Sequence, residues 1–195
     1  MKKLLALALV VMVAGSAIAE DNEFGMFFSP DVFGQEQTNI NTPIFTPFFG
    51  YVVMLYPSVV SVGGYEVGII VPPTVLALSA SGPNGWTNFG DNFNHLVGYG
   101  APVPAAPEGT VLCTLQLMLN ADAVVGIEYH ASNPGSVPGH DGPAITDGED
   151  PTIILPCPLT VDANGEFPFT VATINGPGVV ATEDHTLSSV KALFR

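Results

Sequence analysis

Short β-rich runs separated by turn-forming residues are the feature that most restricts the fold of this sequence. Val, Ile, Phe, Tyr and Thr gather in these runs, and the 21 Gly and 18 Pro, with Asn and Asp, interrupt them. Apolar residues at helical spacing are nearly absent before residue 183. The pattern predicts an all-β, antiparallel sandwich of about nine strands. We expect the strands at residues 24–28, 48–56, 64–71, 75–80, 94–99, 110–119, 124–130, 153–157 and 167–174.

The run at residues 110–119 illustrates the expected alternation. Val111, Cys113, Leu115 and Leu117 would share one face of a strand, and the polar residues between them would share the other. Cys113 is therefore expected to point into the core.

The first 19 residues have the order of a secretory signal. Lys2 and Lys3 precede an apolar stretch at residues 4–14, and Ala17-Ile18-Ala19 has the A-x-A form of a cleavage site. The stretch is shorter than the about 20 residues of a membrane-spanning helix, so we expect no membrane insertion. A retained N-terminal core helix is the alternative. We expect a secreted protein, extracellular or periplasmic, with one domain at residues 20–182 and a tail at 183–195.

The charge of the remaining chain is strongly negative. All 18 acidic residues follow residue 19, and the basic residues there are Lys191 and Arg195, which gives residues 20–195 a formal charge of −16. Nucleic acids and anionic membranes are bound by clustered Lys and Arg, so both are excluded as partners. The acidic side chains would keep the protein soluble in an extracellular medium, or their oxygen atoms would bind divalent cations.

Cys113 and Cys157 are the two cysteines of the chain. In an exported protein oxidation is the usual state, so we expect a disulfide between them. Two separately buried thiols are the alternative, because sequence does not show whether the Cα atoms lie within bonding range.

Two segments are expected to be long loops and a third to be a hairpin turn. Residues 81–92 and 132–151 are rich in Gly, Asn, Pro and Asp, and loops of such length are commonly functional. Residues 162–165, Asp-Ala-Asn-Gly, suit a hairpin turn. Leu187, Val190 and Leu193 recur at helical spacing, which predicts a short helical or extended tail that docks on the domain or is bound by another protein.

The loop at residues 81–92 contains a candidate ligand site. Asn84, Trp86, Asn88 and Phe89 combine aromatic rings with amides, the composition of a sugar-stacking surface. Trp86 is the single tryptophan, and a structural place in the core is the alternative for it.

Calcium is the cofactor that the acidic residues suggest. Asp147, Glu149 and Asp150 place three carboxylates within four residues, which either a cation or solvent would neutralise. A similar group, Asp162, Asn164 and Glu166, lacks the sixth-position Gly and the distal Glu of an EF-hand loop and is interpreted as a turn. The sequence has neither the G-x-S-x-G motif of a serine hydrolase nor the H-E-x-x-H motif of a zinc site.

Several segments resemble a group of secreted bacterial proteins. They are GMFFS at residues 25–29, YVVML at 51–55, VGGYE at 62–66, LVGYG at 96–100, TVLCTL at 110–115 and SVKALFR at 189–195. The sandwich of that group looks like the cohesin or carbohydrate-binding-module type. Cohesins bind dockerins, so the resemblance implies non-catalytic recognition without identifying a ligand.

The leading hypothesis from the sequence is a secreted, non-catalytic module that binds a protein or a polysaccharide at or beyond the cell surface. One alternative is a structural subunit that assembles through strand edges or through its apolar tail. The other is a hydrolase in which His130, His140 and His185 converge with carboxylates in three dimensions.

Overall fold

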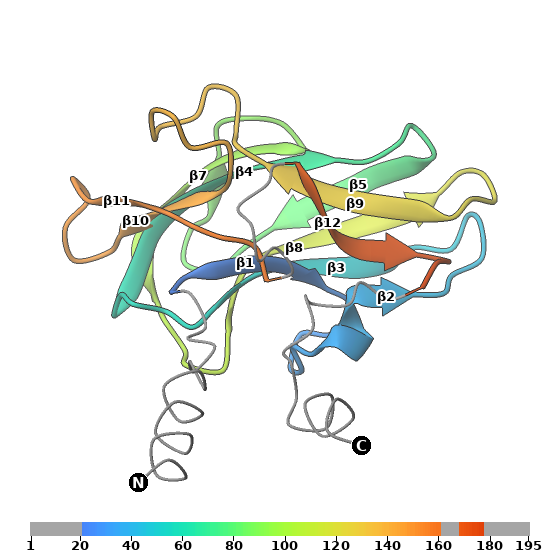
Figure 1. The fold of residues 1–195 in the computed structure, drawn as a ribbon, viewed down its shortest axis with the longest axis horizontal. Helices are drawn as coiled ribbons and strands as arrows, with labels where there is room; N and C mark the ends of the chain where they lie inside the picture. The colour runs from blue at the N-terminus through green and yellow to red at the C-terminus, as the bar shows by residue number, and fades with distance from the viewer. Residues whose placement is uncertain (1–20, 161–167, 178–195) are drawn as a thin grey trace, which may run out of the picture.

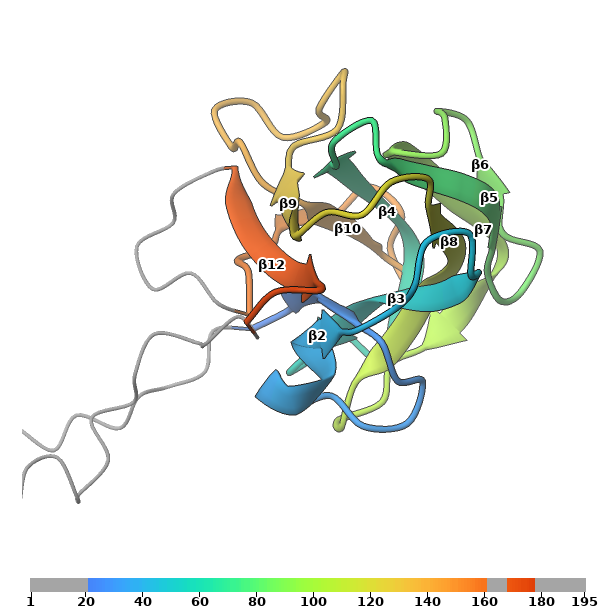
Figure 2. The same ribbon diagram turned by 90° about the vertical axis from the view of Figure 1, so that its right-hand side faces the viewer.

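The β-rich runs form two sheets that pack face to face in the computed structural model, which describes residues 21–160 and 168–177 (Figure 1). All strand pairs of both sheets are antiparallel except that of β12 with β2. The predicted all-β sandwich is therefore confirmed. Viewed after a turn of 90°, β5, β6 and β7 lie at one side of the sandwich and β12 at the other (Figure 2).

The smaller sheet has four strands in the order β1-β3-β8-β5. These are β1 (Glu23–Phe27), β3 (Phe48–Leu55), β8 (Thr110–Leu119) and β5 (Val75–Ser81). The outer side of β1 is covered, because the amide of Phe24 donates to the carbonyl of Pro158 and its carbonyl accepts from Thr160.

The larger sheet has eight strands, of which six follow the order β11-β10-β4-β9-β12-β2. Strand β7 also pairs with β4, and β6 pairs with β7. A 3-10 turn, η1 (Gln35–Thr38), precedes β2. The strands are β2 (Asn39–Ile40), β4 (Ser61–Ile70), β6 (Thr87–Asn88), β7 (Asn94–Pro104), β9 (Val125–His130), β10 (Ala144–Asp147), β11 (Ile154–Pro156) and β12 (Phe169–Ile174).

Alternate residues of each strand build the core between the sheets. The inward set includes Val52 of β3, Val67 of β4, Leu115 of β8 and Ile127 of β9, and none of these four side chains is exposed to solvent. Each such aliphatic side chain stabilises the fold by roughly 1.5–3 kcal/mol through the area it removes from water.

The nine expected strands are all present, and the sequence missed three more. Strands β2 and β6 have two residues each, and β10 has four in a segment rich in Pro, Gly and Asp, so none shows a readable alternation. Val111 also departs from its expected face. A bulge in the pairing of β3 with β8 sends Leu112 into the core, and Val111 packs instead on the separate cluster around Phe27 and Val53.

The N-terminal segment, the turn at residues 162–165 and the tail at 183–195 lie outside the described residues, so their predictions stay predictions. In the part of the chain that is described, no helix is long and apolar enough to span a membrane.

Candidate binding groove

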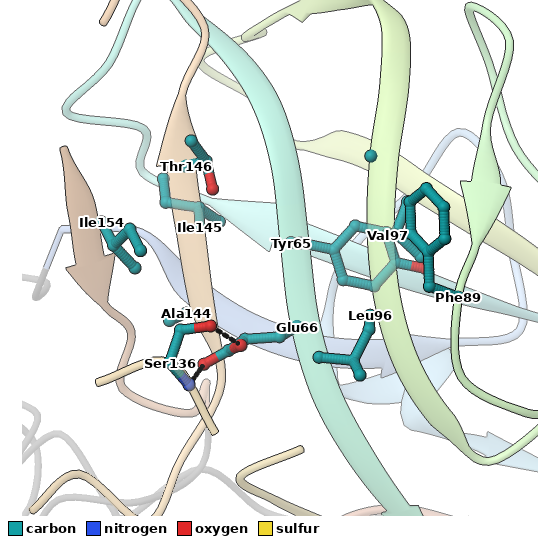
Figure 3. A pocket seen from close by; sticks show the side chains of 11 residues that line it. Tyr65, Glu66, Phe89, Leu96, Val97, Ser136, Ala144, Ile145, Thr146 and Ile154 are labelled. Carbon is teal, nitrogen blue, oxygen red and sulfur yellow. Dashed lines mark hydrogen bonds between the residues drawn. The ribbon is translucent and has the colours of Figure 1, made fainter. Parts of the chain in front are cut away.

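A shallow groove crosses the outer face of the larger sheet (Figure 3). It encloses a volume of about 220 Å³. Strands β4, β7, β10 and β11 contribute to its lining, together with Phe89 from the loop after β6 and Ser136 from the loop before β10. The groove thus joins segments that are far apart in the sequence.

The floor of the groove is low because two glycines lie side by side on it. Gly64 of β4 pairs with Gly98 of β7, and on its other side Gly64 pairs with Thr146 of β10. Thr146 in turn pairs with Ile154 of β11, and Gly98 pairs with Thr87 of β6. One continuous row of five residues therefore runs across five strands and has no side chain at two neighbouring positions, the third and the fourth.

The two glycines differ in whether their positions have room for a side chain. A Cβ on Gly64 would lie 2.4 Å from the carbonyl oxygen of Val97, so glycine is required there by the backbone. A Cβ on Gly98 would lie 3.6 Å from the nearest atom, a ring carbon of Phe89, which is an ordinary contact. Packing therefore does not require a glycine at position 98. The space that a side chain at this position would fill is part of the groove.

Phe89 forms one wall and is held there by its loop although its side chain is 77% exposed. Its amide donates to the carbonyl of Leu96 at 2.9 Å. The side-chain oxygen of Asn88 accepts from the amides of Gly90 and Leu96, at 3.0 and 2.9 Å. Asp91 caps the end of the loop by accepting from two further amides. These bonds fix the position of an exposed aromatic ring whose burial would release apolar surface from water.

Glu66 closes one end of the groove. It lies between Ala144 and Leu96 in the sheet and is 7% exposed. Its two carboxylate oxygens accept from the amide and the hydroxyl of Ser136, at 2.8 and 2.7 Å (Figure 3). The carboxylate thereby attaches the loop before β10 to the sheet and has both oxygens occupied.

A buried polar group lies beneath the groove. The hydroxyl of Tyr65 is 2.8 Å from Nδ1 of His95, and the indole of Trp86 donates to the same hydroxyl at 3.5 Å. Nε2 of His95 faces the carbonyl of Asn92 at 3.2 Å, so that nitrogen carries the proton and Nδ1 accepts from Tyr65. Burial lowers the pKa of His95 to about 4, and burial raises the pKa of Tyr65 well above its ordinary value.

The four predicted ligand residues occupy different positions. Trp86 packs against the core and makes an edge contact with the His95 ring, and Asn84 donates to the carbonyl of Pro102. Asn88 shapes the loop. Phe89 alone among the four lines the groove. Their role in binding stays a prediction.

The structure does not gather Asp147, Glu149 and Asp150 into a metal site. No group of three or more His, Cys, Asp or Glu side chains that could hold an ion occurs at residues 21–160 and 168–177. Asp147 accepts from the amide of Glu149, and Asp150 accepts from the amide and hydroxyl of Thr152. These hydrogen bonds lower the pKa of Asp150 and stabilise turns in the loop, and calcium binding there stays a prediction.

The predicted disulfide is not formed in this structure. Cys113 and Cys157 are both free and buried, which is the alternative that the sequence left open. Cys113 lies inside on β8 of the smaller sheet, whereas Cys157 follows β11 at the edge of the larger sheet. Burial raises the pKa of Cys113 to about 11 and also raises that of Cys157.

Among solved structures, the chain is similar to two type II cohesins of Acetivibrio cellulolyticus. A cohesin domain from the cellulosome shares 13% identity over 80% of this chain and 96% of its own, with a TM-score of 0.48. The second cohesin module of the adaptor ScaA scaffoldin shares 11% over 88% of this chain and all of its own, with a TM-score of 0.47. No protein-family model and no curated protein matches the chain.

Proposed function

We propose that this protein is an exported, non-catalytic recognition module that binds a protein partner in the groove of its larger sheet. One observation carries the proposal. Ile154 ends the row that contains the glycine pair, the ring of Phe89 lies next to Gly98 across the groove, and the two side chains are exposed by 41% and 77%. Two exposed apolar walls beside a floor lowered by two glycines form a surface that gains free energy when an apolar group of a partner fills it.

The dimensions of the groove suit a folded partner. Ile154 belongs to β11, and the Phe89 ring lies next to Gly98 of β7, which is three strand spacings away. Neighbouring strands lie about 4.8 Å apart, so Ile154 and Gly98 are on the order of 14 Å apart. An α-helix with its side chains is about 10–12 Å wide, so the groove of about 220 Å³ would admit apolar side chains from the face of a partner's helix or strand.

The polarity of the groove favours a protein over a glycan. Sugar hydroxyls need accessible amides and carboxylates, but Glu66 is only 7% exposed and both its oxygens already accept from Ser136. Trp86, the ring best suited to stack on a sugar, packs on the core. The apolar side chains of a protein helix or strand need no such partners.

The absence of an acid–base pair supports a non-catalytic role. Glu66 is the one ionisable carboxylate among the described groove residues, and no histidine joins it there. The secretory signal at residues 1–19 supports export, and the acidic surface suits a protein that works outside the cytoplasm.

Site-specific photo-crosslinking would test the proposal. A photoreactive amino acid is placed at Ile154 in the groove or at Val60, which is 70% exposed outside it, and the chain is mixed with the cell-surface fraction of its host. We expect a saturable protein adduct from position 154, lost with Phe89→Ser and absent from position 60. Equal adducts at both positions, or retention by polysaccharide that Phe89→Ser abolishes, would contradict a protein-binding groove.

A further inference from the structure

Strand β5 has one long side with no hydrogen-bonding partner. Residues from Val75 to Ser81 pair with β8 on one side of the strand. On the other side, no backbone hydrogen bond from Leu76 to Ser81 occurs within the described part of the chain. The amides and carbonyls on that side form a ready template for another strand.

The other sheet edges of the described residues are closed or short. Strand β1 is covered by residues 158–160. The larger sheet ends on β11, which has three residues including Pro156, on β2, which has two, and on β6, which also has two. On either side of β6, residues 84–91 bond to the outer side of β7. β5, with seven residues, is thus the long free edge of the described structure.

The usual devices that protect an edge are mostly missing from β5. Natural edge strands carry Lys, Pro or inward-pointing charges that prevent pairing with another chain. Residues 75–81 read VLALSAS and contain none of these. Leu76 and Leu78 are exposed by 36% and 45%. A bulge at Leu78 is the one irregularity in the strand.

Charge indicates which partner can use this edge. Residues 21–160 and 168–177 contain thirteen Asp and Glu and no Lys or Arg, so two copies repel each other wherever acidic surfaces meet. Strands β3, β8 and β5 contain no charged residue. A basic partner would be drawn to the acidic surfaces instead, because β5 offers it no counter-charge. The uncharged edge is where two copies approach without repulsion between facing side chains.

We propose that two copies of this chain pair through their β5 strands. Antiparallel pairing of the two edges is isologous, so the same residues serve both copies. It joins the two four-stranded sheets into one eight-stranded sheet. The groove of each copy lies on the other sheet, so the dimer presents two grooves and can bind a repetitive surface with added avidity.

Sedimentation velocity tests the dimer. The full chain is expressed with its own N-terminal segment so that any processing takes place, and it is studied from about 5 to 500 μM. We expect a monomer–dimer equilibrium that strengthens when NaCl is raised from about 50 to 500 mM, because salt screens the repulsion between acidic copies. A monomer throughout this range, or a dimer that weakens with salt, would overturn the proposal.

A matched pair of variants locates the interface. Leu78→Lys places like charges at the β5 edge and should weaken the dimer about tenfold or more. Val60→Lys makes the same charge change at another exposed site and should not weaken it. If both variants weaken the dimer equally, the contact lies elsewhere. The same conclusion follows if the dimer persists in Leu78→Lys but is lost when residues 178–195 are deleted.

Hydrogen exchange gives an independent measurement on the unmodified chain. Those amides at residues 76–81 that face away from β8 should become protected as the protein is concentrated, and amides in the loop at residues 82–93 should not. Unchanged exchange in β5 at concentrations where the chain is dimeric would overturn the proposal. Neither outcome depends on groove binding, since Phe89→Ser removes a groove wall and should leave the dimer intact.

Discussion

The hydroxyl of Tyr65 lies 2.8 Å from Nδ1 of His95, and the two side chains are 3% and 0% exposed. The bond holds His95 in its neutral form between Tyr65 and the carbonyl of Asn92. Since Trp86 also bonds to Tyr65, the loop that carries Phe89 is fixed to the core from beneath the groove. A buried polar network of this kind stabilises one conformation of the loop as long as every member keeps its partner.

We expect His95 to make stability depend on pH between about 6.5 and 4. Burial lowers its folded pKa to about 4, whereas the unfolded chain binds the proton near pH 6.5. As the pH falls through this range, protonation favours the unfolded chain, and up to about 3 kcal/mol of stability is lost. Urea unfolding at a series of pH values measures this.

His95→Gln is the control, because carboxylates titrate in the same range. Glutamine can keep both hydrogen bonds but does not titrate. The variant should lose less stability than the natural chain between pH 6.5 and 4. Identical pH profiles for both would mean that folding does not lower the pKa of His95.

Trp86→Ala should destabilise the fold, since the ring packs on the core. Truncation of a partly buried Trp is expected to cost about 2–3 kcal/mol. Phe89→Ala should change stability by less than about 0.5 kcal/mol, because that ring is mostly exposed. Urea denaturation compares the two, and equal losses would mean that Phe89 is also a structural residue.

The two thiols should be unreactive in the native protein. Burial raises both pKa values, so almost no thiolate forms near neutral pH. Alkylation of the native chain should leave Cys113 and Cys157 unmodified, and alkylation after unfolding without reductant should label both. An unfolded, unreduced chain that takes up no label would establish the disulfide instead.

The sequence predicted most of the strands because alternation survives wherever one face is buried. Cys113, Leu115 and Leu117 lie on the expected inward face of β8 and are buried in the core. Val111 was misplaced because a bulge adds a residue without any signal in composition. β10 was missed because its four residues become a strand through pairing with β4 and β11, which sequence does not show.

The groove was less predictable than the fold. Phe89 was found because a Gly- and Asn-rich loop with aromatic residues is a common binding element. Trp86 was named in the same site with a place in the core as the alternative, and the partner that holds it inward is Tyr65, which is 21 residues distant. Glu66 and Gly98 were missed because their roles depend on Ser136 and Gly64, which only the pairing of strands and loops brings near.

The two floor glycines provide the most direct test of the groove. Gly98→Val adds a side chain that enters the groove, and its Cβ meets no closer atom than the Phe89 ring at 3.6 Å. Gly64→Val would instead force a Cβ to within 2.4 Å of the carbonyl oxygen of Val97, so we expect it to destabilise the fold.

The decisive measurement is the crosslinking yield at position 154 in the Gly98→Val chain, with its free energy of unfolding determined alongside. The recognition groove predicts that the partner adduct disappears while stability changes by less than about 1 kcal/mol. A folded Gly98→Val chain that still forms the adduct at full yield would contradict binding in the groove.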